Sequence, residues 1–185
     1  MKERPRLVFD TNCIVDLEER RPAATSLDAL VAAWRVGKID LAVTAVTASE
    51  NQPGGGILCN FSEFEARLSR LGLADVHVLC PLATWDVGYF DHALWSSDDL
   101  EALAEKLRGI LFPDEAPGDG SQGVGVAAKW RNHHCDVMVA WCCIHHGWDH
   151  LITRDNNFHM HQKDLAAAGL PFVLRPKVAA EEYAT

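Results

Sequence analysis

The sequence lacks long hydrophobic runs. No stretch approaches the roughly 20 consecutive apolar residues that a membrane-spanning helix needs, which argues against a transmembrane segment. Residues 1–10 include basic side chains but no apolar run of signal-peptide length. We therefore expect a cytoplasmic protein that does not associate with a membrane.

Positive charge and phosphate-binding glycine motifs are also scarce. The formal net charge of -9 argues against a broadly basic nucleic-acid binder. It does not exclude a nuclease, because a carboxylate site is negative only until it binds a divalent cation. The glycine-rich loops at 51–56 and 113–125 lack G-x-x-x-x-G-K-[ST] and G-x-G-x-x-G, so neither is expected to cradle a nucleotide phosphate.

The sequence has six cysteines but no C-x-x-C pair. Disulfide frameworks are typical of short secreted chains, so we expect reduced thiols in apolar surroundings at five positions, Cys13, Cys80, Cys135, Cys142 and Cys143. The histidines around Cys135 and Cys142 leave a structural zinc site open as the alternative. We favour buried thiols with surface histidines, because free cysteine is among the most buried residue types.

The hydrophobic residues that are present predict one domain, 1–185, with an α/β fold. A chain of 185 residues, 48% of them hydrophobic, buries roughly 70% of its unfolded surface when it folds, so it needs no disulfide or metal cross-link for stability. Strand-like segments occur at 7–9, 39–50, 76–80, 150–153 and 171–174, and helical stripes at 27–36, 64–71, 97–111 (capped by Ser97) and 136–144. This alternation favours a short parallel sheet with helices on both faces, a three-layer α/β/α sandwich.

Four acidic residues stand at the ends of these elements. Asp10 follows "LVF", Glu50 follows "LAVTAVTAS", Asp155 follows "LITR", and Asp136 begins the predicted helix "DVMVAWCCI". A carboxylate at a helix N-terminus is favoured by the helix dipole. Because sites in open α/β sheets form beyond the carboxyl ends of the strands, we expect the four acids to share one pocket.

Such a cluster needs a compensating charge. Two unit charges about 4 Å apart repel by about 4 kcal/mol at an effective dielectric near 20, so at least one carboxylate should have a pKa raised by its neighbours. Mg²⁺ or Mn²⁺ would remove this cost, because hard cations prefer oxygen ligands. A single acid after a strand is more often a turn residue or an N-cap. The prediction of a metal site therefore depends on all four acids occurring together.

The sequence resembles the PIN-domain family of metal-dependent ribonucleases. The opening strand with Asp10-Thr11-Asn12 is similar to the family's D-[TS]-[NS], and "VTAVTASE" is similar to its second acidic motif. "NHHCDVMVAWCCIHHG" matches the acid before an Ala-rich helix, and "HLITRDNNF" matches L-[VI]-T-x-D-x-x-F. The matches extend from Leu7 to Phe158 in the family's order.

The resemblance implies an endoribonuclease with Mg²⁺ or Mn²⁺ bound by Asp10, Glu50, Asp136 and Asp155. Asn12 and Asn157 would support this cluster, and three flanking basic residues would contact RNA phosphates, namely Lys129, Arg131 and Arg154. The resemblance further implies RNA as a partner and a toxin of a toxin–antitoxin pair, and it leaves an antitoxin protein and a homodimer open as partners.

The sequence departs from the family after Asp155. Many relatives have a further acid there, whereas this chain has Asn156 and Asn157, so a second metal would be held less tightly. The alternative function is therefore a PIN-fold module that binds RNA or a partner protein without turnover. "VFDTN" also resembles the start of haloacid-dehalogenase phosphatases, but Asn12 stands where their second aspartate is required.

Overall fold

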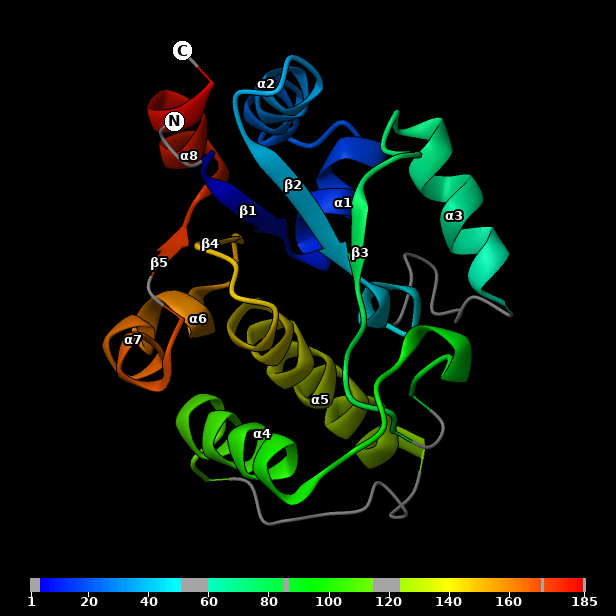
Figure 1. Ribbon diagram of the computed structural model, residues 1–185, viewed down its shortest axis with the longest axis vertical. Helices are drawn as coiled ribbons and strands as arrows, with labels where there is room; N and C mark the ends of the chain where they lie inside the picture. Colours follow the sequence, from blue (N-terminus) through cyan, green and yellow to red (C-terminus); the bar gives the residue numbers. More distant parts are fainter. Residues whose placement is uncertain (1–3, 51–59, 85–86, 115–123, 171, 185) are drawn as a thin grey trace.

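The computed structural model describes residues 4–50, 60–84, 87–114, 124–170 and 172–184. Its strands form one five-stranded sheet in the order β3-β2-β1-β4-β5 (Figure 1), and every neighbouring pair is parallel. The strands are β1 (Arg6–Phe9), β2 (Asp40–Thr44), β3 (His77–Leu79), β4 (His150–Ile152) and β5 (Phe172–Leu174).

Helices cover both faces of the sheet (Figure 1). One layer contains α1 (Thr11–Glu18), α2 (Ala24–Arg35), α3 (Phe61–Arg70) and α8 (Pro176–Tyr183). The other contains α4 (Asp98–Leu111), α5 (Val124–His145), α6 (Asn156–Met160) and α7 (Gln162–Ala168). Two short 3-10 helices, η1 (Ala45–Ala48) and η2 (Phe90–His92), follow β2 and β3 in the chain. This confirms the predicted α/β sandwich of three layers.

The alternation of strand residues explains the two cores. Successive side chains of a strand point to opposite faces. Leu7 and Phe9 of β1 are fully buried in the core that contains α1 and α2, and Val8 is fully buried in the core that contains α4 and α5. Because both faces of β1 are covered after the exposed Arg6, its remaining three residues are all apolar, as in other central parallel strands.

The sheet order brings three of the predicted acids together. β1 lies between β2 and β4, with Phe9 in register with Val43 and with Ile152. The three carboxyl ends therefore meet at one edge of the sheet. η1 turns the chain after Thr44, so the predicted strand 39–50 is shorter than expected and Glu50 follows a 3-10 turn.

One predicted helix boundary is wrong, because α5 begins at Val124 rather than at Asp136. Asp136 therefore lies inside the helix and not at its N-terminus. Good helix formers precede Asp136, including Ala127, Ala128 and Lys129, and α5 packs along α4. The glycine-rich composition of 113–125 hid this start; residues 115–123 of that predicted loop lie outside the described residues.

Smaller expectations are also resolved. Ser97 precedes α4 at the N-cap position, but its side chain makes no capping hydrogen bond. The five cysteines named above are free, and all but Cys80 are buried. No helix in the described part of the chain is long and apolar enough to cross a membrane.

Candidate functional site

The four predicted acids line one pocket of about 340 Å³. We call it the acidic pocket and define it by its lining residues, Asp10, Thr11, Asn12, Glu50, Asn132, Asp136 and Asp155. They come from the end of β1 and the start of α1, from the segment after η1, from the turn after β4, and from the interior of α5. Folding thus gathers side chains that are far apart in the sequence, as expected.

Asp10 is the most firmly held of the four. It is 3% exposed and caps α1, because its Oδ1 accepts a hydrogen bond from the Thr11 amide at 2.7 Å. Its Oδ2 accepts from Thr153 Oγ1 at 2.5 Å and from the Asn12 side-chain amide. Burial raises the pKa of Asp10 to about 6, although the bonds from Thr153 and Thr11 act in the opposite direction. These contacts place Asn12 in the cluster, as the resemblance implies.

Asp155 also has a capping role. Its Oδ1 accepts from the Asn157 amide at 2.8 Å, which makes Asp155 the N-cap of α6. The Asn157 side chain points elsewhere and donates to the Leu111 carbonyl at 3.0 Å. Asn156 accepts from Arg175 Nη2 at 2.8 Å. Neither asparagine is among the residues described as lining the acidic pocket. Their side chains instead bond to the end of α4 and to Arg175.

Glu50 lies near Asp10, Asp155 and the buried Arg67. Burial raises the pKa of Glu50 to about 8, and the charges of Asp10 and Asp155 raise it further, while Arg67 lowers it. Arg67 is 4% exposed and also binds Glu18, with Nη2 at 2.7 Å from Oε2. The cation that sequence reasoning missed here is Arg67, since a buried arginine on an amphipathic helix has no sequence motif.

Asp136 has the least compensated charge. It is half-buried on α5, and among the described residues neither a hydrogen-bond donor nor a cation is a cause of its pKa shift. Burial raises the pKa of Asp136 to about 9, and the charges of Asp10, Glu50 and Asp155 contribute in the same direction. Neighbouring negative charges therefore contribute to the raised pKa values of Asp10, Glu50 and Asp136, as expected. The largest cause of each raised pKa, however, is burial and not charge repulsion.

The donors of the acidic pocket suit a hard divalent cation. Its lining offers carboxylate and amide oxygens, the ligands that Mg²⁺ and Mn²⁺ prefer, and includes neither histidine nor cysteine. Within the described chain, no three His, Cys, Asp or Glu side chains form a ready-made metal-binding group. The fit thus rests on the kind of donors and on the uncompensated Asp136.

The three predicted phosphate contacts lie in different places. Lys129 is exposed and lines a second pocket beside α5. Arg131 is half-buried and is not part of the described lining of either pocket. Arg154 is partly exposed, but its guanidinium binds a buried partner: its Nη2 lies 2.7 Å from Oδ1 of Asp16 and its Nε binds the other carboxylate oxygen. Asp16 is fully buried, so Arg154 compensates a charge of the fold.

Three polar residues of the site were not predicted to belong to it: Thr11, Asn132 and Thr153. Asn132 precedes Asp136 by one helical turn, and the spacing would have indicated it only if α5 had been extended upstream. Thr153 is fully buried and connects the cluster: it donates to Asp10, accepts from Asn12 Nδ2 at 2.8 Å, and accepts from the Asp155 amide at 3.0 Å. Thr153 is part of the motif "LITRD", but nothing in the sequence indicates that its hydroxyl bonds to Asp10 and Asn12.

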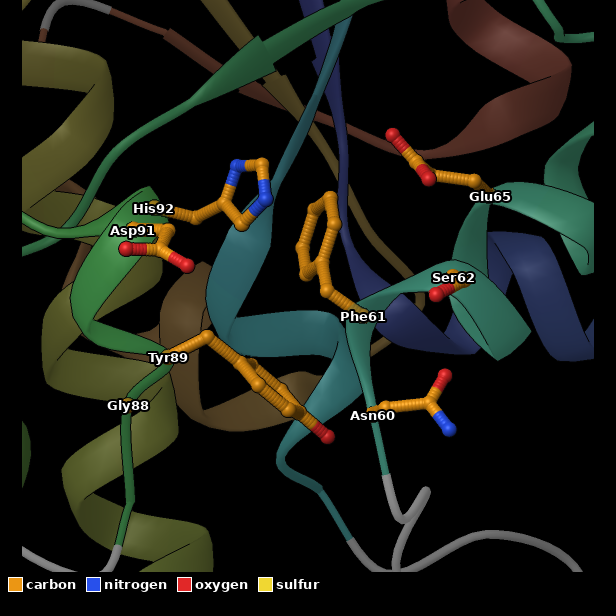
Figure 2. A pocket seen from close by; sticks show the side chains of 8 residues that line it. All are labelled: Asn60, Phe61, Ser62, Glu65, Gly88, Tyr89, Asp91 and His92. Atoms are coloured by element: carbon orange, nitrogen blue, oxygen red, sulfur yellow. The ribbon is translucent and has the colours of Figure 1, made fainter.

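A further pocket, of about 540 Å³, lies between the start of α3 and η2. Figure 2 shows the rings of Phe61 and His92 side by side there, with centroids 3.5 Å apart and planes at 19°. Its lining contains the acids Glu65 and Asp91 but none of the four predicted acids. The sequence did not single out this pocket.

Comparison with known proteins adds no family assignment. No protein-family model matches the chain, and no curated protein matches it significantly.

Proposed function

We propose that this protein is a PIN-like endoribonuclease that hydrolyses RNA phosphodiester bonds with Mg²⁺ or Mn²⁺. The carrying observation is that acids from four separate elements line one pocket, with Asp136 half-buried and with neither a described hydrogen-bond donor nor a described cation among the causes of its pKa shift. Such an arrangement is costly for folding alone, and carboxylate clusters of this kind are typical of cation sites. The motif resemblance and the parallel α/β sandwich support the same function.

The roles of the acids follow from their environments. Asp10, Asp136 and Asp155 would hold the ion, and Asp10 is oriented for this by Thr11, Asn12 and Thr153. When bound, Mg²⁺ or Mn²⁺ supplies positive charge for the phosphodiester transition state and acidifies a coordinated water.

Glu50 is the best candidate for the general base. Burial raises the pKa of Glu50 to about 8 in the metal-free protein, so its carboxylate is a stronger base than that of an ordinary glutamate. As the water oxygen bonds to phosphorus, the Glu50 carboxylate accepts the water proton. The bond between phosphorus and the leaving ribose oxygen breaks with its electron pair on that oxygen, which takes a proton from solvent water, and protonated Glu50 returns its proton to solvent.

The direct test is cleavage of labelled single-stranded RNA by the purified protein with Mn²⁺. Asp136→Asn should lower the rate by about 100-fold or more, the scale of a lost charge-stabilising group. Asp75→Asn is the matched control: Asp75 is an exposed acid before β3, at the opposite edge of the sheet, and its removal should leave the rate unchanged. Cleavage that persists after chelation, or in Asp136→Asn, contradicts the mechanism.

A toxin role is part of this proposal and has its own test. Induced expression of the wild-type chain should arrest bacterial growth, and Asp136→Asn should relieve the arrest. An adjacent small gene whose product restores growth would identify the antitoxin. Growth arrest that is unchanged in Asp136→Asn would separate toxicity from the acidic pocket.

The second candidate is a PIN-like module that binds RNA or a partner protein without turnover. One observation favours it: Asp10 and Asp155 both cap helices, and Asn156 and Asn157 both bind neighbouring segments, so these polar groups already have structural roles. Thermal unfolding with Mn²⁺ distinguishes the two functions. A cation at 100 times its dissociation constant should add about 2.7 kcal/mol to stability, whereas no shift with millimolar Mn²⁺ favours the binding module.

A further inference from the structure

A second pocket on α5, of about 330 Å³, combines aromatic, basic and polar side chains. Its lining includes Phe112, Asp114, Lys129, His133, Asn157 and His161. We call it the stacking pocket, because the rings of Phe112 and His133 lie parallel there, with centroids 3.8 Å apart and planes at 6°.

The stacking pocket and the acidic pocket are built on the same helix. Asn132 and Asp136 line the acidic pocket, whereas Lys129 and His133 line the stacking pocket. The members of each pair are four residues apart, so each pair shares a face of α5 and the two faces are neighbours.

A hydrogen-bonded path also connects the two pockets. Asp155, in the acidic pocket, accepts from the Asn157 amide at 2.8 Å. The Asn157 side chain, in the stacking pocket, donates to the Leu111 carbonyl at 3.0 Å. One residue therefore contacts both sites, and a substrate that enters the acidic pocket has the stacking pocket beside it.

The chemistry of the stacking pocket matches the parts of a nucleotide. Lys129 carries a full positive charge, and His133 and His161 have N–H donors in either protonation state, so they can bind phosphate oxygens. Aromatic and imidazole rings stack on unpaired bases. Asp114, the acid in the lining, is exposed and can accept a hydrogen bond from an exocyclic amino group of a base.

We infer that the stacking pocket binds the unpaired RNA nucleotide next to the phosphodiester that is cleaved in the acidic pocket. The base lies against the Phe112–His133 pair, and Lys129 and His161 bind its phosphate. This rests on the proposed ribonuclease function and adds a substrate requirement, because a base can reach the rings only where the RNA is single-stranded.

The test measures, by fluorescence anisotropy, the binding of a labelled single-stranded RNA of about eight nucleotides. All variants also carry Asp136→Asn, so that the RNA is not cleaved during the measurement. Adding His133→Ala should weaken binding about tenfold, because a stacking surface is lost. His133→Phe should retain binding, since it keeps the ring. Lys129→Ala changes an exposed side chain, so it should fold normally and weaken binding several-fold, with a smaller salt dependence.

The pocket in Figure 2 provides a matched control. His92 stacks on Phe61 much as His133 stacks on Phe112, but its pocket is lined by Glu65 and Asp91 and has no lysine in its described lining. His92→Ala should leave RNA affinity within about twofold, less than the loss of one stacked base. Lys177→Ala, on α8, serves in the same way for Lys129→Ala.

The outcomes separate the two proposals. RNA binding that depends on His133 and Lys129, without cleavage by the wild-type protein, contradicts the ribonuclease and supports the stacking pocket. Cleavage by the wild type, with binding unaffected by His133→Ala and Lys129→Ala, overturns the stacking pocket alone. If RNA does not bind at all, both are wrong.

Discussion

The four carboxylates of the acidic pocket differ in how their charge is compensated. Asp10 accepts three hydrogen bonds, Asp155 accepts one from a helix amide, and Glu50 has Arg67 nearby. For Asp136, neither a described hydrogen-bond donor nor a described cation is a cause of the pKa shift. The residue that the fold supports least is thus the one with the most strongly raised pKa among these acids, which is expected where a cation completes the site.

At the residue scale, Thr153→Val tests how Asp10 is held. The change keeps the side-chain shape but removes a hydroxyl that is fully buried and bonds to Asp10, Asn12 and the Asp155 amide. We expect a loss of about 1–3 kcal/mol in the free energy of unfolding, the cost of unpaired buried polar groups. Loss of this donor should also raise the pKa of Asp10 further and weaken Mn²⁺ binding.

Denaturant unfolding and Mn²⁺ titration at pH 7 measure both effects. Thr25→Val is the control, because Thr25 is exposed on α2. A Thr153→Val protein as stable as the wild type, with unchanged Mn²⁺ affinity, would show that this hydroxyl does not orient Asp10.

At the scale of elements, one ion pair fastens α1 to the turn between β4 and α6. Asp16 of α1 is fully buried, and the Arg154 guanidinium binds both of its carboxylate oxygens. The Arg154 amide also donates to Asn12 Oδ1 at 3.1 Å. These contacts hold the segments that carry Asp10 and Asp155 against each other, so Arg154 acts on the site through its neighbours.

Arg154→Ala should therefore lower the free energy of unfolding and leave the affinity for RNA largely unchanged. Removing one partner of a buried ion pair costs about 3–5 kcal/mol, and we expect roughly 2–4 kcal/mol here because the Arg154 side chain is 40% exposed. The comparison is Arg20→Ala, which breaks the exposed pair of Arg20 with Asp28 and should cost less than about 1 kcal/mol. Urea unfolding and RNA anisotropy give the two readouts. A large loss of RNA affinity at unchanged stability would instead make Arg154 a phosphate ligand.

At the scale of the whole molecule, the sheet order itself concentrates charge. Placing β1 between β2 and β4 brings Asp10, Glu50 and Asp155 to one edge, and α5 adds Asp136. In the unfolded chain these carboxylates are solvated and distant. Folding without a cation therefore has an electrostatic cost, and that cost should depend on pH.

We predict that the metal-free protein loses stability between about pH 6.5 and 8.5. The folded-state pKa values of Glu50 and Asp136, about 8 and 9, exceed the ordinary values, so the folded state binds more protons and deprotonation favours unfolding. Each such group contributes at most about 1.4 kcal/mol per pH unit. Below this range, His134 acts in the opposite sense, because burial lowers its pKa to about 4 and its protonation favours unfolding.

Urea unfolding across this pH range, with chelator or with Mn²⁺, is the measurement. Mn²⁺ should flatten the decline. Asp136→Asn should flatten it in part and should stabilise the metal-free protein at pH 8, since it removes a carboxyl group that must take up a proton when the chain folds. Stability that is constant or rises from pH 6.5 to 8.5 in chelator would contradict the raised pKa values.

Local patterns were sufficient for much of the fold and for part of the site. The apolar run at Leu7 to Phe9 predicted β1, and alternating elements predicted a parallel sandwich, because hydrophobic periodicity and the order of strands and helices along the chain can be read from short segments. The same reasoning failed at the start of α5, where glycines obscured a helix that packing against α4 supports. It also missed α6, α7 and α8, which are short and weakly patterned.

The sequence by itself determined that acids follow the strand-like segments, and so predicted an acidic pocket if those strands were neighbours in the sheet. Only the tertiary structure decided how each charge is used. Arg154 binds Asp16 across 138 positions, Thr153 binds Asp10 across 143, and Lys129 lines a neighbouring pocket instead of the acidic one. The physical reason is that periodicity is a property of adjacent residues, whereas the partner of a buried charge is chosen by packing between segments that no local pattern relates.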